Sequence, residues 1–309
     1  MKYYKAKIKP TSPFGTNPMS DTIFGQLVWT LSDMGEDLSK LLADYDTSPF
    51  LVVSDFLPFN MGNVPKIPTI YKVEGAKNDK INKILERKKI KAKNYISIET
   101  LYSTASLNKN KIVELAQALV KFNKSAEIIR CSINRKTGTT GDGFDPYPVY
   151  DTFFTDNAEF TFYFYIADES NFGMIQEALE LIGKTGFGRD ASLGRGQFEV
   201  LEFDEIEFSP ENKNAIYTLG NVALEGLSVE RAYYEPFTRF GRHGNIRAVM
   251  GNPFKNPLVM ALQGALLFGD NNIFSKPYIG KSIRKLSYYG DTVQQGYSLY
   301  IPINVEVQP

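Results

Sequence analysis

The order of its secondary-structure patterns limits most strongly what this chain can fold into. Residues 3–9 alternate polar and apolar side chains as a strand does. A helix is expected to open at Ser20 and Asp21, because Ser20 can cap free backbone N–H groups and Asp21 suits the positive helix end. The later patterns predict a strand at 127–133, an aromatic strand at 158–166, a helix at 172–182 and a strand at 197–207. This order describes a ferredoxin-like unit.

The pattern divides the chain into two expected domains. The ferredoxin-like order accounts for residues 1–208, with a long insertion at 46–126 between the first helix and the second strand. Residues 209–309 hold further strand-like runs at 227–234, 258–268 and 297–305, which indicate a smaller β-rich domain. A length of 309 residues suits two domains of about 150 residues each. The expected fold class is therefore α+β.

Charge and composition exclude several classes of protein. Apolar residues make up 43% of the chain, which excludes intrinsic disorder. The 35 basic residues balance the 35 acidic ones, so a site for a polyanion has to be a local patch. No stretch approaches the roughly 18 apolar residues that a membrane span needs, and the first residues resemble a strand more than a signal peptide. We expect a cytoplasmic protein with no membrane partner.

The rarity of cysteine and histidine argues against several kinds of catalytic and metal site. Cys131 is the one cysteine and His243 the one histidine, which excludes a disulfide framework and a metal site built on two histidines. We expect Cys131 to be a small buried residue of a strand. Carboxylates such as Asp151, Asp156 and Asp168 are scattered at strand ends without metal-ligand spacing. The sequence therefore predicts no catalytic residue, no metal and no cofactor.

A glycine-rich segment at 183–196 is the most informative motif. Five glycines and three cations lie in fourteen residues between a helix and a strand, where connections usually have about 2–6 residues. Glycines let backbone N–H groups approach a phosphate closely. The segment is neither a P-loop nor a dinucleotide fingerprint, because it precedes a strand. It is interpreted as a loop that holds a polynucleotide backbone, the alternative being a flexible loop with incidental charge.

Three further segments carry positive charge. Residues 130–143 look like a projecting hairpin with a polar tip that could wedge into nucleic acid, although an ordinary surface hairpin is the alternative. The segment 77–93 has eight cations and two carboxylates, and is either a solvated helix face or a phosphate-contacting surface. In the segment 239–245, His243 is flanked by Arg239 and Arg242 and could touch RNA, although lone histidines are mostly structural.

Several of these segments, in this order, resemble the RAMP superfamily of CRISPR proteins. The glycine-rich segment is similar to the signature loop of the superfamily. One branch is closer, the subunit of the type III-A (Csm) effector complex that caps the 5′ end of the CRISPR RNA. The segments similar to that branch are 8–16, 20–25, 57–58, 64–68 and 132–139, with a weaker resemblance at 256–260 and 295–302.

The resemblance implies a noncatalytic RNA-binding subunit with two ferredoxin-like domains and a protruding β-hairpin thumb. Its partners would be the 5′ tag of the CRISPR RNA, the large polymerase-like subunit and the adjacent backbone RAMP subunit, with target RNA contacted indirectly. Such subunits help to discriminate self from foreign RNA in antiviral defence. The alternatives are the equivalent subunit of another type III subtype, an endoribonuclease that matures CRISPR RNA, and a purely structural interaction module.

The segments above supply the candidate RNA-binding residues, with Arg239 and His243 not decided by the resemblance. The candidates are Asn134, Arg135, Lys136, Thr137, Gly183, Lys184, Gly186, Gly188, Arg189, Ser192, Gly194, Arg195, Gly196, Arg239 and His243. Charge reversal at Arg135 or Arg189 is expected to weaken retention of guide RNA and to leave the subunit folded.

Overall fold

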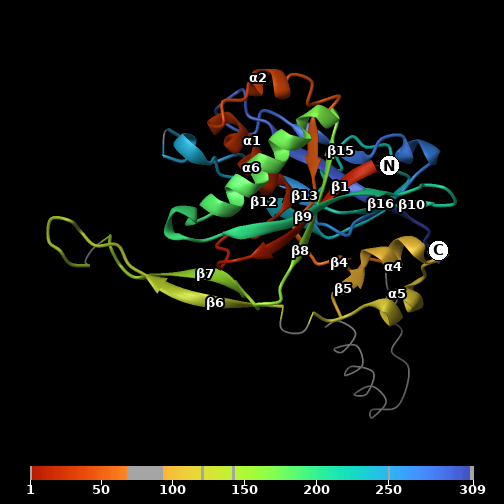
Figure 1. The fold of residues 1–309 in the computed structure, drawn as a ribbon, viewed down its shortest axis with the longest axis horizontal. Helices are drawn as coiled ribbons and strands as arrows, with labels where there is room; N and C mark the ends of the chain where they lie inside the picture. The colour runs from red at the N-terminus through yellow and green to blue at the C-terminus, as the bar shows by residue number, and fades with distance from the viewer. Residues whose placement is uncertain (1, 68–92, 120–121, 141–142, 250, 307–309) are drawn as a thin grey trace, which may run out of the picture.

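Two five-stranded antiparallel sheets form the centre of the molecule (Figure 1). The computed structural model describes residues 2–67, 93–119, 122–140, 143–249 and 251–306. The basic segment 77–93 lies outside these residues, apart from Lys93. In the described part of the chain, no helix is both long enough and apolar enough to cross a membrane.

The first sheet has the strand order β2-β8-β1-β9, and β3 also pairs with β8. Its elements are β1 (Lys2–Pro10), β2 (Leu51–Val53), β3 (Leu57–Pro58), β8 (Phe160–Ile166) and β9 (Phe198–Glu207). Two 14-residue helices, α1 (Ser20–Asp33) and α6 (Phe172–Thr185), contact each other. Helix α1 packs on β2 and α6 packs on β9, because each helix carries an apolar stripe that needs cover.

The predicted succession of strands and helices is present, but its second strand was assigned to the wrong residues. Strand β2 takes that place, beside β8, and it lies inside the range 46–126 that was expected to be an insertion. The predicted strand at 127–133 corresponds to β6 (Asn123–Arg130), which pairs only with β7 (Tyr147–Phe154) among the described residues. A three-residue strand that is buried at every position shows no alternation, so periodicity could not find β2.

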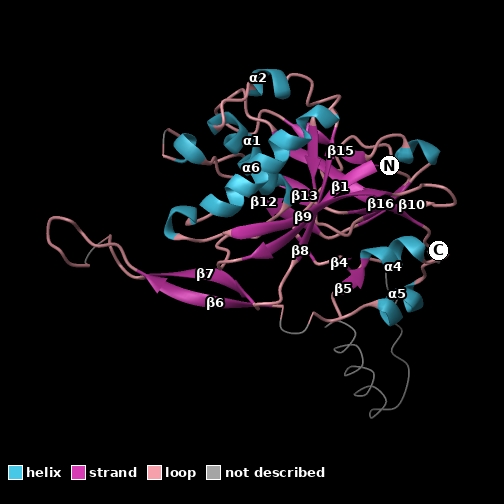
Figure 2. Ribbon diagram, viewed as in Figure 1, coloured by secondary structure: helices cyan, strands magenta, loops and turns pink. Residues whose placement is uncertain are grey.

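The second sheet has the strand order β11-β14-β10-β16-β15. Its strands are β10 (Ala215–Thr218), β11 (Arg231–Tyr233), β14 (Leu266–Phe268), β15 (Tyr278–Ile283) and β16 (Gln294–Ile303). Two more strand pairs flank the sheets, β4 (Met61–Asn63) with β5 (Tyr95–Ser97) and β12 (Pro236–Arg239) with β13 (Leu258–Ala261). Figure 2 shows how few helices accompany these strands. The shorter helices are α2 (Leu38–Leu41), α4 (Ile98–Ser103) and α5 (Lys109–Leu115), with 3-10 turns at Glu169–Asn171, Ala191–Leu193, Asn245–Ala248 and Asn271–Phe274.

A single large hydrophobic cluster reaches both sheets. It includes Tyr3 and Phe162 of the first sheet and Leu299 and Ile301 of the second. Strand β16 is buried at all ten positions and contacts α1, β2 and α4 as well as its own sheet. The Tyr3 hydroxyl donates to the backbone carbonyl of Tyr300 at 2.9 Å, which ties the first strand of the chain to the last.

The start of α1 differs from the expectation that Ser20 caps it. Met19 occupies the cap position without a side-chain cap, and the Ser20 N–H donates to Asp55 Oδ1 at 2.7 Å. The Ser20 hydroxyl instead accepts the Asn221 N–H at 2.9 Å, which ties α1 to the chain after β10. Burial raises the pKa of the Asp55 carboxyl to about 7, against the smaller opposing effect of its hydrogen bonds to Ser20.

The hairpin of β6 and β7 extends away from both sheets, as Figure 1 shows. The hairpin predicted around 130–143 is thus present, with strands of eight residues each. Cys131 was expected to be buried in a strand, and this expectation was wrong. Because β6 ends at Arg130, Cys131 lies in the projecting tip of the hairpin, where it is exposed.

Candidate nucleic-acid interface

The glycines of the 183–196 segment allow the chain to pack closely on itself. Gly183 is buried in the last turns of α6, and Gly186 ends that helix with a φ of +98°. Gly188 has a φ of +75°, and a Cβ there would lie 2.6 Å from the Thr16 Cβ. Gly196 has a φ of +74°, and a Cβ there would overlap the Phe187 carbonyl oxygen. These glycines are therefore required by backbone conformation and packing.

Gly194 is the exception within this segment. Its φ is +78°, but a Cβ built on it would meet no atom within 4 Å. It lies beside Ser192 and Leu193, whose side chains are exposed. Lys184, at the end of α6, is also exposed. Lys184, Thr185 and residues 192–194 are thus the most accessible parts of the segment, and the side chains of Arg189 and Arg195 are partly exposed.

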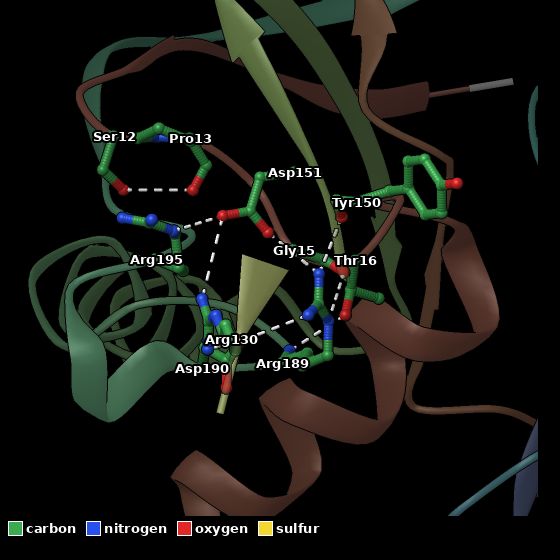
Figure 3. A network of polar contacts seen from close by, with 10 residues as sticks. All are labelled: Ser12, Pro13, Gly15, Thr16, Arg130, Tyr150, Asp151, Arg189, Asp190 and Arg195. Carbon is green, nitrogen blue, oxygen red and sulfur yellow. Dashed lines mark hydrogen bonds and ion pairs between the residues drawn. The ribbon is translucent and has the colours of Figure 1, made fainter. Parts of the chain in front are cut away.

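A network of charged residues joins this segment to the strands of the hairpin (Figure 3). Asp151 of β7 is fully buried at its centre. Arg189 Nη2 donates to Asp151 Oδ1 at 2.9 Å, and Arg195 Nε donates to Asp151 Oδ2 at 2.6 Å. Arg130, the last residue of β6, places Nη1 at 2.7 Å from Asp190 Oδ2. Three guanidinium groups and two carboxylates leave one positive charge in excess.

Arg189 is held by backbone atoms as well as by Asp151. Its Nε donates to the Gly15 carbonyl at 3.1 Å, and its Nη2 donates to the Tyr150 carbonyl at 2.7 Å. Its backbone N–H donates to Thr16 Oγ1 at 2.9 Å. Arg189 therefore links the loop after β1, the middle of strand β7 and the glycine-rich segment. The expectation that its charge can be reversed without loss of the fold does not fit these contacts.

The tip of the hairpin is organised by Asn134. Asn134 Oδ1 accepts the Lys136 N–H at 2.9 Å, and the Asn134 N–H donates to the Thr139 carbonyl at 3.1 Å. The hydroxyls of Thr137 and Thr139 lie 3.1 Å apart. The side chains of Arg135 and Lys136 are exposed, and no acceptor in the described residues pairs with either. The tip therefore offers two free cations on an ordered turn.

The strands of the hairpin present large apolar side chains to solvent. Ile129, Tyr147 and Tyr150 are exposed at 63%, 46% and 60%. Tyrosine rings can stack on nucleobases, and exposed apolar side chains of this size are typical of binding surfaces. The Tyr150 hydroxyl donates to Glu127 at 2.9 Å, and this contact raises the pKa of Tyr150. The hairpin thus combines stacking surface with cations at its tip.

Arg239 and His243 are not brought to this network. Arg239 forms a bidentate ion pair with Asp21 of α1, at 2.5 Å from Nε and 2.7 Å from Nη2. His243 is buried, with its ring edge against Tyr289, and its backbone N–H donates to the Pro253 carbonyl. Burial, with the nearby cations, lowers the pKa of His243. Both side chains therefore serve the packing of their own region.

Sequence reasoning missed Asp151, the residue that gathers the arginines. It was noted only as one of several carboxylates at strand ends, because it lies 38 and 44 residues before its two arginine partners. The sequence offered little signal for it beyond a carboxylate set among the aromatic residues Tyr150 and Phe153. Among the described residues, no group of three histidine, cysteine or acidic side chains could hold a metal ion.

Comparisons by sequence find no relative. No family model matches the chain, and no curated protein matches it. Comparison of the structure with solved structures does find matches. One is the Csm4 subunit in a crystal structure of the Csm1-Csm4 cassette in complex with cA4, with a TM-score of 0.61 and 18% identity over 100% of both chains.

A second match is the Csm4 subunit of a Csm3-Csm4 subcomplex in the type III-A CRISPR-Cas interference complex. It has a TM-score of 0.58 and 14% identity, and covers 98% of this chain and 100% of the other. The chain has the fold of Csm4. A Csm4 fold is a mixed α/β arrangement dominated by sheets, which agrees with the α+β class expected from the sequence.

Proposed function

We propose that this chain is a noncatalytic RNA-binding subunit of a type III-A CRISPR interference complex in the cytoplasm, where it caps the 5′ tag of the CRISPR RNA. The observation that carries the proposal is the likeness to Csm4 over the whole length of both chains. The motif resemblance at 8–16, 132–139 and 183–196 supports it independently, because it comes from the residues alone. By helping to hold the tag, the subunit would aid discrimination between self and foreign RNA.

The proposed protein partners are the large polymerase-like subunit and the adjacent backbone RAMP subunit. The matched Csm4 chains come from a cassette with Csm1 and a subcomplex with Csm3, which supports one neighbour of each kind for this chain. A formal net charge of zero suits a subunit that has to bind proteins as well as RNA. Target RNA would be contacted indirectly, through the assembled complex.

The proposed RNA contacts are the residues of the hairpin tip and the exposed part of the glycine-rich segment. Single-stranded RNA is held by cations along its backbone and by aromatic rings that stack on its bases. Arg135 and Lys136 supply free cations at the tip, and Tyr147 supplies an exposed ring nearby. Arg189, Arg239 and the buried glycines take structural roles in this proposal, so fewer residues meet RNA than the sequence indicated.

We also propose that residues 1–208 and 209–309 are two ferredoxin-like units. The strand order β2-β8-β1-β9 supports this for the first unit. In the chain, α1 lies between β1 and β2, and α6 lies between β8 and β9. The second unit is β-rich and shares the large hydrophobic cluster with the first. A shared core of this kind means that the two units would not act as separable bodies.

The direct test is to purify the tagged protein from its native host at moderate salt and to sequence the 5′ ends of RNA that accompanies it. A uniform repeat-derived 5′ end, together with several protein partners, supports the proposal, and the identity of the partners assigns the type III subtype. Heterogeneous RNA, or protein free of RNA, contradicts it. Metal-free cleavage of repeat RNA by the isolated protein would instead identify a processing endoribonuclease.

A paired substitution tests the hairpin tip. Arg135→Glu with Lys136→Glu should reduce the RNA content of purified complexes, because it places two negative charges where the proposal places RNA. Lys40→Glu, an exposed charge reversal at the end of α2, is the matched control and should leave the RNA content unchanged. Crosslinking of RNA to residues 183–196 in the wild-type complex would argue against a purely structural module.

A further inference from the structure

The arginines around Asp151 differ in how many of their donors are occupied. Arg189 donates from Nε to the Gly15 carbonyl and from Nη2 to the Tyr150 carbonyl and to Asp151 Oδ1. Its Nη1 forms an ion pair with Asp190 at 3.2 Å. Arg195 donates from Nε alone, to Asp151 Oδ2. Within the described residues, no acceptor pairs with its two terminal nitrogens, and about a quarter of the side chain is exposed. Arg195 therefore has an unused pair of donors at the surface.

We propose that the two terminal nitrogens of Arg195 bind one backbone phosphate of the RNA in a bidentate manner, and that Asp151 is the positioning residue that aims them. This inference rests on the proposed function and deepens it, because it assigns one phosphate subsite. A guanidinium group is planar, and its paired N–H donors match two oxygens of a phosphate. Figure 3 shows Nε turned toward Asp151 and the terminal nitrogens turned away from it.

Asp151 is suited to this role because it cannot turn. Its side chain is fully buried, and its Oδ1 is held by Arg189, which is itself fixed by backbone carbonyls. The backbone of its neighbour Thr152 exchanges two hydrogen bonds of 2.9 Å with Phe14 of the loop after β1. The Oδ2 atom that accepts Arg195 Nε is therefore fixed relative to the glycine-rich segment.

The charge balance allows a phosphate to bind at this place. Arg130, Arg189 and Arg195 face only Asp151 and Asp190, so the network keeps one excess positive charge. The bound phosphate would supply the missing negative charge. Ser192, three residues before Arg195 in the same segment, is exposed, so its hydroxyl is also open to a ligand on this surface.

Two variants distinguish binding that depends on the orientation of the Arg195 donors from binding that depends only on net charge. Arg195→Lys keeps the charge but removes the fork, because the single ammonium group would pair with Asp151. Asp151→Asn removes a negative charge, so simple electrostatics predicts tighter RNA binding, whereas the positioning role predicts weaker binding. The two explanations thus predict opposite signs for the same substitution. Lys40→Gln is the matched control on a remote surface.

The assay is fluorescence anisotropy of the full-length chain with a labelled single-stranded RNA that carries the repeat-derived 5′ segment. We expect Arg195→Lys and Asp151→Asn each to weaken binding about tenfold, as loss of a hydrogen-bonded charge contact does. Arg195→Gln should also reduce the slope of log K against log salt by about 0.7, the value for one phosphate of a single strand. Thermal unfolding of every variant establishes that it is folded.

Two results would overturn the inference. Wild-type affinity in Arg195→Lys shows that the fork is not used, and this variant is informative even if Asp151→Asn does not fold. Tighter binding by a folded Asp151→Asn shows that the carboxylate acts through charge alone. A wild-type chain that does not bind the RNA overturns the proposed function itself, and so is distinguishable from a failure confined to the variants.

Discussion

Replacement of Asp55 by asparagine should make the protein more stable at neutral pH. The Asp55 carboxyl accepts the Ser20 N–H at the start of α1 and lies at the edge of a small cleft with Asn17 and Tyr95. Burial raises its pKa from 3.8 to about 7, so the folded protein prefers the protonated form. An asparagine oxygen can accept the same N–H without carrying a charge.

The sign and size of the effect follow from this pKa. A group whose pKa is higher in the folded state stabilises the fold fully below its unfolded pKa, near 4, and this contribution is lost as the pH rises through about 7. A difference of about 3 pH units corresponds to about 4 kcal/mol. Because the residue reaches a cleft, solvent screening makes this an upper value for the loss between pH 4 and pH 8.

The assay is urea unfolding of the wild type and Asp55→Asn at several pH values from 4 to 8. The difference in the free energy of unfolding should be small at pH 4 and should grow in favour of the variant up to pH 8. Asp156→Asn, at an exposed turn, makes the same change of net charge at the surface and is the matched control. A constant difference between the wild type and Asp55→Asn would refute the argument from burial.

Two further substitutions test the packing around the candidate interface by thermal or denaturant unfolding. Gly196→Ala should lower the free energy of unfolding by about 3 kcal/mol or more, because a positive φ is combined there with overlap at Phe187. Gly194→Ala should lower it by about 1 kcal/mol, because only its positive φ is unfavourable. Equal losses would contradict the packing role of Gly196. Arg239→Gln should lower the free energy of unfolding by about 3 kcal/mol, because it leaves the buried Asp21 carboxylate without its ion pair. A loss below about 1 kcal/mol would show that the amides of Asn221 and Gln294, which also donate to Asp21, are enough to stabilise this carboxylate.

The long elements with regular patterns could be predicted from the sequence. Helix α1 and strand β1 lie close to their predicted residues, because apolar side chains recur there at the period of the element. Strand β8 does so because a run of aromatic residues favours a strand. The run expected at 258–268 became two short strands, β13 and β14, joined by a turn that contains Gly264 with a φ of +89°. Local patterns do not show which short apolar segment will pair.

The candidate site could be predicted only as a set of segments. The glycine-rich segment and the hairpin were located correctly, but the roles of their residues depend on contacts between distant parts of the chain. Arg189 meets Asp151 from 38 residues away, and Arg239 meets Asp21 from 218 residues away. A single sequence carries no record of such pairings, so arginines that serve ion pairs could not be told from those free to bind a ligand.

Strand β16 also determines when this protein can finish folding. It pairs with β10 and β15 and contacts α1 (Ser20–Asp33) and β2 (Leu51–Val53), whereas β16 itself begins only at Gln294. At roughly 5–20 residues per second, translation of that interval takes on the order of tens of seconds. During this time the nascent chain leaves the inner faces of α1 and β2 without their cover. We expect chaperones on the ribosome, or a partner subunit made nearby, to protect the chain in that interval.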